Sequence, residues 1–64
     1  MKIPTPKYKP LDFIVFKSSS FNMVAMGMIR YAEYDEYNGW VYKVSSLGEA
    51  VMNAIEKEVV EKIN

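Results

Sequence analysis

The dipeptide Asn38-Gly39 restricts the fold of this sequence more than any other feature. Both residues tolerate a positive φ, which a type I′ turn requires at its two central positions. Aromatic residues flank the dipeptide, with Tyr37 before it and Trp40 after it. Strand-forming residues on both sides of such a turn are typical of a β-hairpin. We therefore expect an antiparallel sheet that includes a hairpin with a two-residue turn.

A two-residue turn also fixes which side chains of the hairpin share a face. It pairs Tyr37 with Trp40. On the opposite face it pairs Tyr34 with Lys43. The strand after the turn then has one apolar face, which we expect to pack in the core: Trp40, Tyr42 and Val44. The tyrosines and the acidic pair before the turn are left for contact with a partner.

The chain is short, and it lacks the residue types that cross-link small proteins. Its 64 residues contain no cysteine and no histidine, which excludes disulfides, thiolate sites and the commonest zinc ligand. Half of the residues are hydrophobic and 14% are aromatic, which is typical of a folded chain. We therefore expect one domain, residues 1–64, that folds on apolar burial alone or gains burial as a homo-oligomer.

Charge and hydropathy bear on location and partners. Eight basic and eight acidic residues cancel, and this neutrality argues against nucleic acid as the main partner. The longest uncharged run, residues 18–29, is too short and too polar to span a bilayer. No apolar stretch of the signal-peptide kind follows residues 1–4. We expect a cytoplasmic protein without a membrane partner.

The first half of the chain predicts an arm and two strands. Residues 1–10 contain all three prolines, which fix φ and remove backbone donors, so we expect an extended arm. β-Branched and aromatic residues predict a strand over residues 11–17, and serines mark a loop after it. A second, longer strand begins near Met23, and we expect it to bend or bulge at Gly27.

The last segment has the pattern of a helix. Ser46 and Glu49 fit a capping box. Glu58 can pair with Lys62 one helical turn further on. Hydrophobic residues recur at intervals of four: Leu47, Val51, Ile55, Val59 and Ile63. We predict a helix over about residues 47–62. The alternative is a fourth strand followed by a short turn at residues 58–60.

Three segments resemble the SH3-like barrels found in short bacterial and phage-encoded proteins. Residues 9–15, KPLDFIV, are similar to the lysine–x–glycine–aspartate–x–valine start of such barrels, with Leu11 at the glycine position. Residues 39–44, GWVYKV, resemble one of their strands, and residues 58–63, EVVEKI, resemble their acidic closing turn and last strand. The resemblance implies a binding or adaptor module, because such barrels seldom carry chemistry and the fold alone assigns no function.

Together these patterns predict an α+β fold. We expect a small, strongly bent antiparallel sheet of three to four strands, SH3-like in its path, with a C-terminal helix over about residues 47–62. The alternative is an all-β SH3-like barrel in which the last segment closes the sheet as a strand.

Catalysis is not expected from these residue types. Nucleophilic catalysis needs an activated nucleophile beside a base, and the chain has neither histidine nor cysteine. Asp35 and Glu36 are neighbours, so in a strand their carboxylates point to opposite faces. The three scattered glycines form no phosphate loop, and no calcium-loop spacing occurs. We expect a protein that is not an enzyme and that holds no metal or cofactor.

We expect instead a non-catalytic protein–protein interaction module, because tyrosine, tryptophan, methionine and arginine are the residues that anchor interfaces. The resemblance suggests a phage or mobile-element accessory or inhibitor protein that binds a host protein or a second copy of itself. The candidate partner-binding residues are Arg30, Tyr34, Asp35, Glu36, Tyr37 and Lys43.

Two other partners are kept open. The first alternative is an RNA- or ssDNA-binding SH3-like barrel, in which Arg30, Lys43 and Lys17 contact phosphates while tyrosines stack on bases. The second is a cationic ligand held in an aromatic cage formed by Tyr31, Tyr34 and Trp40.

Overall fold

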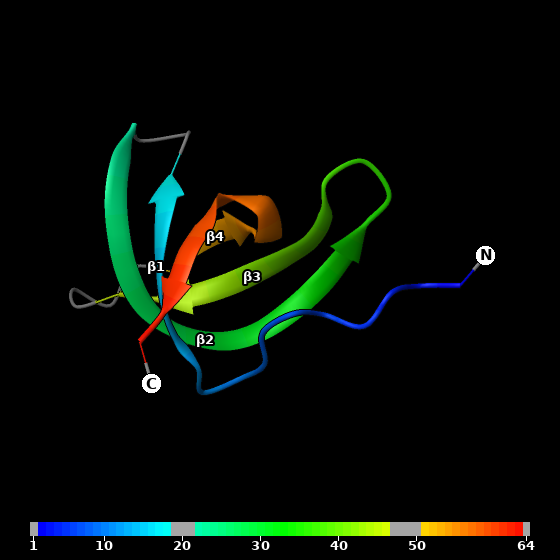
Figure 1. Ribbon diagram of the computed structural model, residues 1–64, viewed down its shortest axis with the longest axis horizontal. Helices are drawn as coiled ribbons and strands as arrows, with labels where there is room; N and C mark the ends of the chain where they lie inside the picture. The colour runs from blue at the N-terminus through cyan, green and yellow to red at the C-terminus, as the bar shows by residue number, and fades with distance from the viewer. Residues whose placement is uncertain (1, 19–21, 47–50, 64) are drawn as a thin grey trace.

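The computed structural model describes residues 2–18, 22–46 and 51–63, which form one antiparallel sheet (Figure 1). Its five strands are β1 (Phe13–Ser18), β2 (Met23–Asp35), β3 (Gly39–Ser45), β4 (Val51–Ile55) and β5 (Val59–Lys62), with a 3₁₀ turn, η1 (Glu56–Glu58), before the last. The order across the sheet is β4-β3-β2-β1-β5. β1 and β4 are separated by two strands and yet are in contact, so the sheet curls around a shared core.

β2 is the long bent strand that joins the two halves of the sheet. Its first half pairs with β1 and its second half pairs with β3. Met28 belongs to both pairings, because it lies opposite Phe13 on one side and opposite Ser45 on the other. One continuous strand therefore contributes side chains to both halves of the core.

The bulge in β2 lies near its middle, but not at the predicted glycine. The register with β3 shifts between Ile29 and Tyr31, which places the extra residue at Arg30. Gly27 has a different role, because the end of β3 approaches β2 closely at this residue. A Cβ added there would meet the backbone carbonyl of Ser45, so the close approach requires a residue without a side chain.

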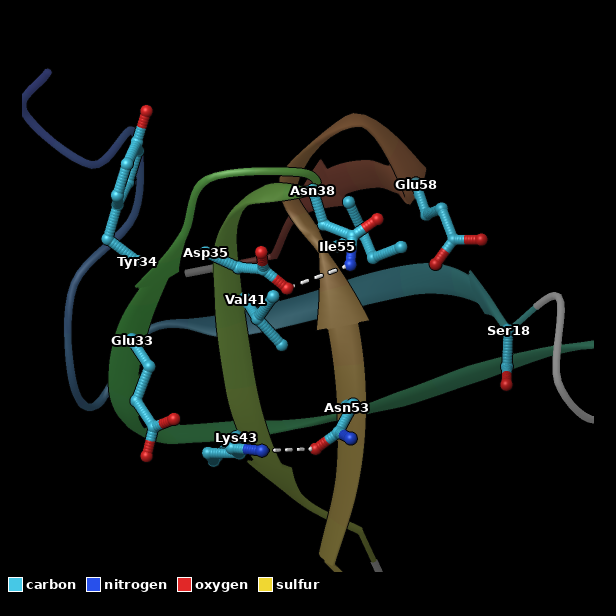
Figure 2. A pocket seen from close by; sticks show the side chains of 10 residues that line it. All are labelled: Ser18, Glu33, Tyr34, Asp35, Asn38, Val41, Lys43, Asn53, Ile55 and Glu58. Carbon is cyan, nitrogen blue, oxygen red and sulfur yellow. Dashed lines mark hydrogen bonds between the residues drawn. The ribbon is translucent and has the colours of Figure 1, made fainter. Parts of the chain in front are cut away.

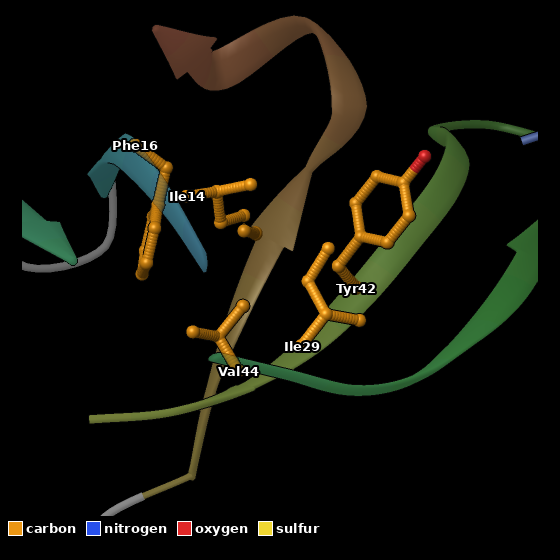
Figure 3. Packing of buried hydrophobic residues seen from close by; sticks show 6 residues of the cluster. Ile14, Phe16, Ile29, Tyr42 and Val44 are labelled. Carbon is orange, nitrogen blue, oxygen red and sulfur yellow. The ribbon is translucent and has the colours of Figure 1, made fainter. Parts of the chain in front are cut away.

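Six fully buried side chains form the core of the described residues: Ile14, Phe16, Ile29, Tyr42, Val44 and Ala54 (Figure 3). Those on β1 and β3 are two residues apart in their strand, as expected for side chains that share one face of a strand. The prediction that Tyr42 and Val44 pack in the core is confirmed. Trp40, predicted with them, lies on the same face but is only half-buried.

The predicted helix over residues 47–62 is wrong, and so is the α+β class. Residues 51–62 form β4, η1 and β5, and the described residues are nearly all-β. The predicted capping box falls mostly on residues 47–50, outside the described residues. None of the described segments is a helix long and apolar enough to cross a membrane.

A spacing of four residues explains why the sequence favoured a helix. Residues four apart share a face in a strand as well as, approximately, in a helix. Antiparallel pairing with β3 turns Ala54 and Met52 toward the core and leaves Val51, a residue of the predicted stripe, exposed. Lys62 approaches the Asp12 carboxylate, with Nζ 3.7 Å from Oδ1. The predicted i,i+4 pairing of Lys62 with Glu58 belongs to a helix that does not form.

A tight turn at residues 9–12 joins the N-terminal arm to β1. The Asp12 N–H donates to the Lys9 carbonyl, and the Lys9 N–H donates to Asp12 Oδ2, both at 3.1 Å. The Leu11 N–H donates to the Ile29 carbonyl at 2.9 Å, which fixes the turn to β2. Leu11 has a φ of 78°, a value that a residue with a Cβ seldom adopts. A residue with a side chain thus adopts a glycine-like backbone conformation in this turn.

Candidate functional site

The hairpin between β2 and β3 has a three-residue loop rather than the predicted two-residue turn. Asp35 pairs with Gly39, so residues 36–38 form the loop. Asp35 Oδ1 accepts a hydrogen bond from the Tyr37 N–H at 2.8 Å, and Oδ2 accepts one from the Asn38 side-chain amide at 3.0 Å. Gly39, the residue after this loop, has a positive φ, 79°, but Asn38 does not, whereas a type I′ turn needs a positive φ at both. The Asp35 carboxylate therefore stabilises the longer loop.

The predicted partner residues at the hairpin tip differ in their contacts. Asp35 serves the loop, and the hydrogen bond from the Tyr37 N–H, followed by that from Asn38, lowers the pKa of its carboxyl group below the ordinary value. Tyr37 is 94% exposed, and Glu36 is exposed beside it. Both side chains therefore lie at the solvent-exposed tip of the hairpin.

The longer loop changes which side chains face each other across the hairpin. Tyr34, predicted to pair with Lys43, pairs with Trp40 instead. Their rings meet edge to face, with centroids 5.4 Å apart. Tyr42 lies two residues beyond Trp40 and therefore on the same side of β3. Tyr34, Trp40 and Tyr42 line one surface of the sheet, which we call the aromatic face.

The N-terminal arm, residues 2–8, lies against the aromatic face. The Trp40 indole Nε1–H donates to the Pro4 carbonyl at 2.7 Å. Nearer the 9–12 turn, the Tyr8 N–H donates to the Tyr42 hydroxyl at 3.1 Å, and the two rings meet edge to face at 5.7 Å. Figure 1 shows the arm running from the turn toward the hairpin end of the molecule. An extended, proline-containing segment is thus held by aromatic side chains.

Glu56, at the start of η1, ties the arm to the end of β4. Its Oε2 accepts hydrogen bonds from the Lys7 N–H at 2.9 Å and from the Tyr42 hydroxyl at 2.5 Å. Burial, together with the bond to Glu56, raises the pKa of Tyr42 to about 12. The hydroxyl therefore stays protonated at neutral pH, where it donates to Glu56 and accepts from the arm.

Arg30 and Lys43, two of the predicted partner residues, lie away from the aromatic face. Lys43 pairs with Tyr31 on the outer side of the sheet, and its Nζ donates to Asn53 Oδ1 at 2.8 Å (Figure 2). Arg30 is exposed in the β2 bulge, next to Tyr31, which is 51% exposed. The outer surface of the sheet thus carries the ring of Tyr31 and two cationic side chains, those of Arg30 and Lys43. Because Tyr31 is separated from the aromatic face, the predicted three-ring cage does not form.

A polar hollow of about 300 Å³ lies beside the hairpin (Figure 2). Two of its charged groups have local partners, since Lys43 is bound to Asn53 and Asp35 is bound to Asn38. The described residues contain no group of three or more side chains that could hold a metal ion. The lining residues are Ser18, Glu33, Tyr34, Asp35, Asn38, Val41, Lys43, Asn53, Ile55 and Glu58.

The contact between Trp40 and the arm is the feature of this surface that the sequence did not reveal. The alternation with Tyr42 and Val44 correctly places Trp40 on the core face. It does not show that Trp40 lies past the edge of the buried residues, where its indole N–H reaches Pro4. The sequence feature that could have indicated this contact is a proline-containing arm in a chain whose single tryptophan lies in a predicted strand.

No protein-family model matches the chain, and neither a curated protein nor a solved structure matches it. Its function is therefore inferred from the geometry of the arm and the aromatic face.

Proposed function

We propose that the protein is a non-catalytic SH3-like binding module that holds an extended, proline-containing segment of a protein partner on its aromatic face. The observation that carries the proposal is the 2.7 Å hydrogen bond from the Trp40 indole to the Pro4 carbonyl. The chain's own arm is an extended, proline-containing segment, and this hydrogen bond holds it on the aromatic face. The strand order β4-β3-β2-β1-β5, with a 3₁₀ turn before β5, supports the SH3-like part of the proposal.

Proline-containing segments suit an aromatic surface for physical reasons. Proline fixes φ, so the segment is extended before it binds and loses little conformational entropy. Its backbone carbonyls have no internal hydrogen-bond partner, which leaves them free for an indole N–H. Tyr34 and Trp40 supply large, rigid contact areas at low entropic cost. A partner segment with these properties can replace the arm contact for contact.

The peptide KIPTPK, which has the sequence of residues 2–7, tests the proposal by NMR. It is titrated into the isotope-labelled full-length protein while the Trp40 indole N–H resonance is followed; this resonance is unambiguous because the chain has one tryptophan. We expect a saturable shift at millimolar peptide, because the tethered arm competes at an effective concentration on the order of 1 mM. A peptide with alanine in place of both prolines should bind more weakly.

Tyr34→Ala and Tyr37→Ala form a matched pair of variants for this titration. Tyr34 contacts Trp40 on the aromatic face, whereas Tyr37 is exposed at the hairpin tip. Loss of an aromatic anchor typically costs about 2 kcal/mol, so Tyr34→Ala should weaken peptide binding by roughly 10-fold or more. Tyr37→Ala should leave it unchanged. An indole resonance that does not move, or an equal loss in both variants, contradicts the proposal.

Single-stranded nucleic acid is a second candidate partner, favoured by the outer surface of β2 and β3. The exposed ring of Tyr31 has Lys43 opposite it and Arg30 beside it. A ring between cations is an arrangement on which a base can stack while the phosphates are neutralised. Glu33 follows on the same face and the net charge is zero, so we expect binding only at low salt.

Fluorescence polarisation with labelled single-stranded oligonucleotides tests this second candidate. Binding at low salt that is lost in Arg30→Glu and in Lys43→Glu supports it. Trp40→Phe is the control, because this residue lies on the opposite face of the sheet and its replacement should not change the affinity. If no binding occurs even at low salt, nucleic acid is excluded as a partner of this surface.

A further inference from the structure

We infer that the partner segment is the arm of a second copy of the chain, and that two copies exchange arms to form a dimer. In this dimer, residues 2–8 of each copy lie on the aromatic face of the other, and each sheet is unchanged. The inference rests on the proposed function, because it uses the same face and the same kind of segment. It adds that the partner is a second copy of the chain and that the 9–12 turn is the hinge that controls binding.

The contacts that hold the arm can be supplied equally well by a second copy. Hydrogen bonds join the arm backbone to side chains of the sheet and of η1: Pro4 to Trp40, Lys7 to Glu56 and Tyr8 to Tyr42. No residue of the arm belongs to a strand, so exchange leaves the strand pairing of both copies intact. Exchange of an identical segment between two copies therefore costs no arm contact.

The 9–12 turn, which folds the arm back onto its own sheet, contains an unfavourable backbone conformation. Leu11 has a φ of 78°, in the left-handed region that favours glycine. Its side chain is 70% exposed, so burial does not compensate for this backbone. Opening the turn breaks the Leu11 N–H bond to the Ile29 carbonyl and the two bonds between Lys9 and Asp12. In return, Leu11 can adopt a negative φ and the arm can continue away from β1. Each copy of an exchanged dimer is relieved of this strain.

The first residues of the arm lie at the surface of the molecule. The molecule measures 37 × 23 × 19 Å, and the arm leads along the hairpin toward one end of the longest dimension (Figure 1). Arm residues 2–5 are all exposed on the side that faces solvent. The closed monomer and the exchanged dimer share the arm contacts, so they differ in the hinge and in the entropy of association. We expect exchange as the chain approaches about 1 mM, the order of the effective concentration of a tethered arm.

Sedimentation equilibrium of the full-length protein, from micromolar to millimolar concentration, measures the exchange. It is combined with isotope-filtered NOE spectra of a mixture of labelled and unlabelled chains. We expect the average mass to rise from that of one chain toward that of two. We also expect NOEs between the Trp40 indole N–H of the labelled chain and Pro4 of the unlabelled chain.

Two substitutions at the hinge should move the equilibrium in opposite directions. Leu11→Gly relieves the strain in the closed turn, so it should raise the dimer Kd by roughly 10- to 100-fold over the two hinges. Leu11→Pro cannot adopt a positive φ, so it should open the turn and lower the dimer Kd. If Leu11→Pro does not fold, the dimer Kd of Leu11→Gly compared with that of the unmodified chain is sufficient to test the inference.

A chain that remains monomeric at millimolar concentration overturns the inference. A dimer that lacks the NOEs to Pro4, or whose Kd is unchanged by Leu11→Gly, overturns it as well, because such a dimer uses another surface. The titration with KIPTPK separates this failure from that of the proposed function. If the peptide binds but the arms do not exchange, only the inference is contradicted. If the peptide does not bind and the arms do not exchange, the proposed function is contradicted as well.

Discussion

The Tyr42 side chain belongs to the core and also contacts the N-terminal arm. Its ring is fully buried, while its hydroxyl donates to Glu56 and accepts from the Tyr8 N–H. Phenylalanine would fill the same space but would leave each of these partners with one hydrogen bond fewer. Only the protonated hydroxyl can donate to Glu56. The protonation state of Tyr42 therefore affects the contacts of the core residue with both η1 and the arm.

The raised pKa of Tyr42 predicts a loss of stability in alkaline solution. Burial and, secondarily, the hydrogen bond to Glu56 raise this pKa from 10.0 to about 12. The fold therefore prefers the protonated hydroxyl, whose contribution is complete below pH 10 and is lost as the pH rises from 10 to 12. Urea denaturation should show the free energy of unfolding falling over this range in the unmodified protein and falling less in Tyr42→Phe.

The same variant should also be less stable at neutral pH, by about 1–2 kcal/mol, because the hydrogen bonds of the hydroxyl are lost. Tyr37→Phe is the matched control. Its ring is exposed at the hairpin tip, so it should retain both the stability and the pH dependence of the unmodified protein. If Tyr42→Phe loses stability between pH 10 and 12 as steeply as the unmodified protein, Tyr42 is not the titrating group.

At the scale of elements, the sequence predicted local structure better than contacts between distant segments. Asn38-Gly39 correctly predicts the hairpin, but the Asp35 carboxylate binds two loop donors and lengthens the loop. The partner of Tyr34 thereby moves three residues, from Lys43 to Trp40, and an odd shift places Tyr34 on the opposite face. Tyr34 therefore lies on the face opposite to the one that the sequence predicted, next to Trp40 rather than Lys43.

The C-terminal segment shows the limit of periodicity. A hydrophobic interval of four fits both a helix and a strand, and the choice depends on whether an edge strand is available for pairing. β3 provides that edge for β4, and β1 provides one for β5. Neither edge can be recognised before the sheet is assembled. The contact between the arm and Trp40 was hidden for the same reason, because it joins residues 36 apart in the chain.

Gly27 and Gly39 serve different purposes in β2 and β3, which predicts different costs of substitution. A Cβ at Gly27 would meet the Ser45 carbonyl and lie 2.7 Å from Val44 Cγ1, so Gly27→Ala should cost about 1–3 kcal/mol through overpacking. A Cβ at Gly39 meets nothing within 4 Å, so Gly39→Ala should cost only about 1 kcal/mol, from its φ of 79°.

Denaturant unfolding of both variants measures these two costs. Gly39→Asn is the control for the turn, because asparagine tolerates the left-handed region and should restore part of the stability that Gly39→Ala loses. If Gly27→Ala is no less stable than Gly39→Ala, the close approach of β3 to β2 at Gly27 is contradicted.

At the scale of the whole molecule, the small core makes the arm part of the fold. A chain of 64 residues is expected to have a stability of roughly 3–10 kcal/mol. The described core consists of six side chains, and Tyr8 from the arm packs against it from outside. Each half-buried aromatic residue therefore contributes a large share of the total. Binding and folding are linked, since displacement of the arm by a partner must replace what Tyr8 contributes.

Tyr8→Ala should accordingly both destabilise the protein and release the arm. Removal of a partly buried ring that meets Tyr42 edge to face should cost about 2 kcal/mol, which corresponds to a fall in Tm of roughly 8–16 °C for a domain of this size. Circular dichroism measures the Tm. The Trp40 indole N–H resonance should move already in the folded state, because its bond to Pro4 depends on the docked arm.

Tyr31→Ala is the matched control for this substitution. It removes a tyrosine of the outer surface that is 51% exposed, so it should change the Tm little and should leave the indole resonance in place. If Tyr8→Ala lowers the Tm but leaves the indole resonance unmoved, residues 2–7 dock independently of Tyr8. Residues 2–7 would then be held by the hydrogen bonds at Pro4 and Lys7, and a partner could displace them without removing the contacts of Tyr8.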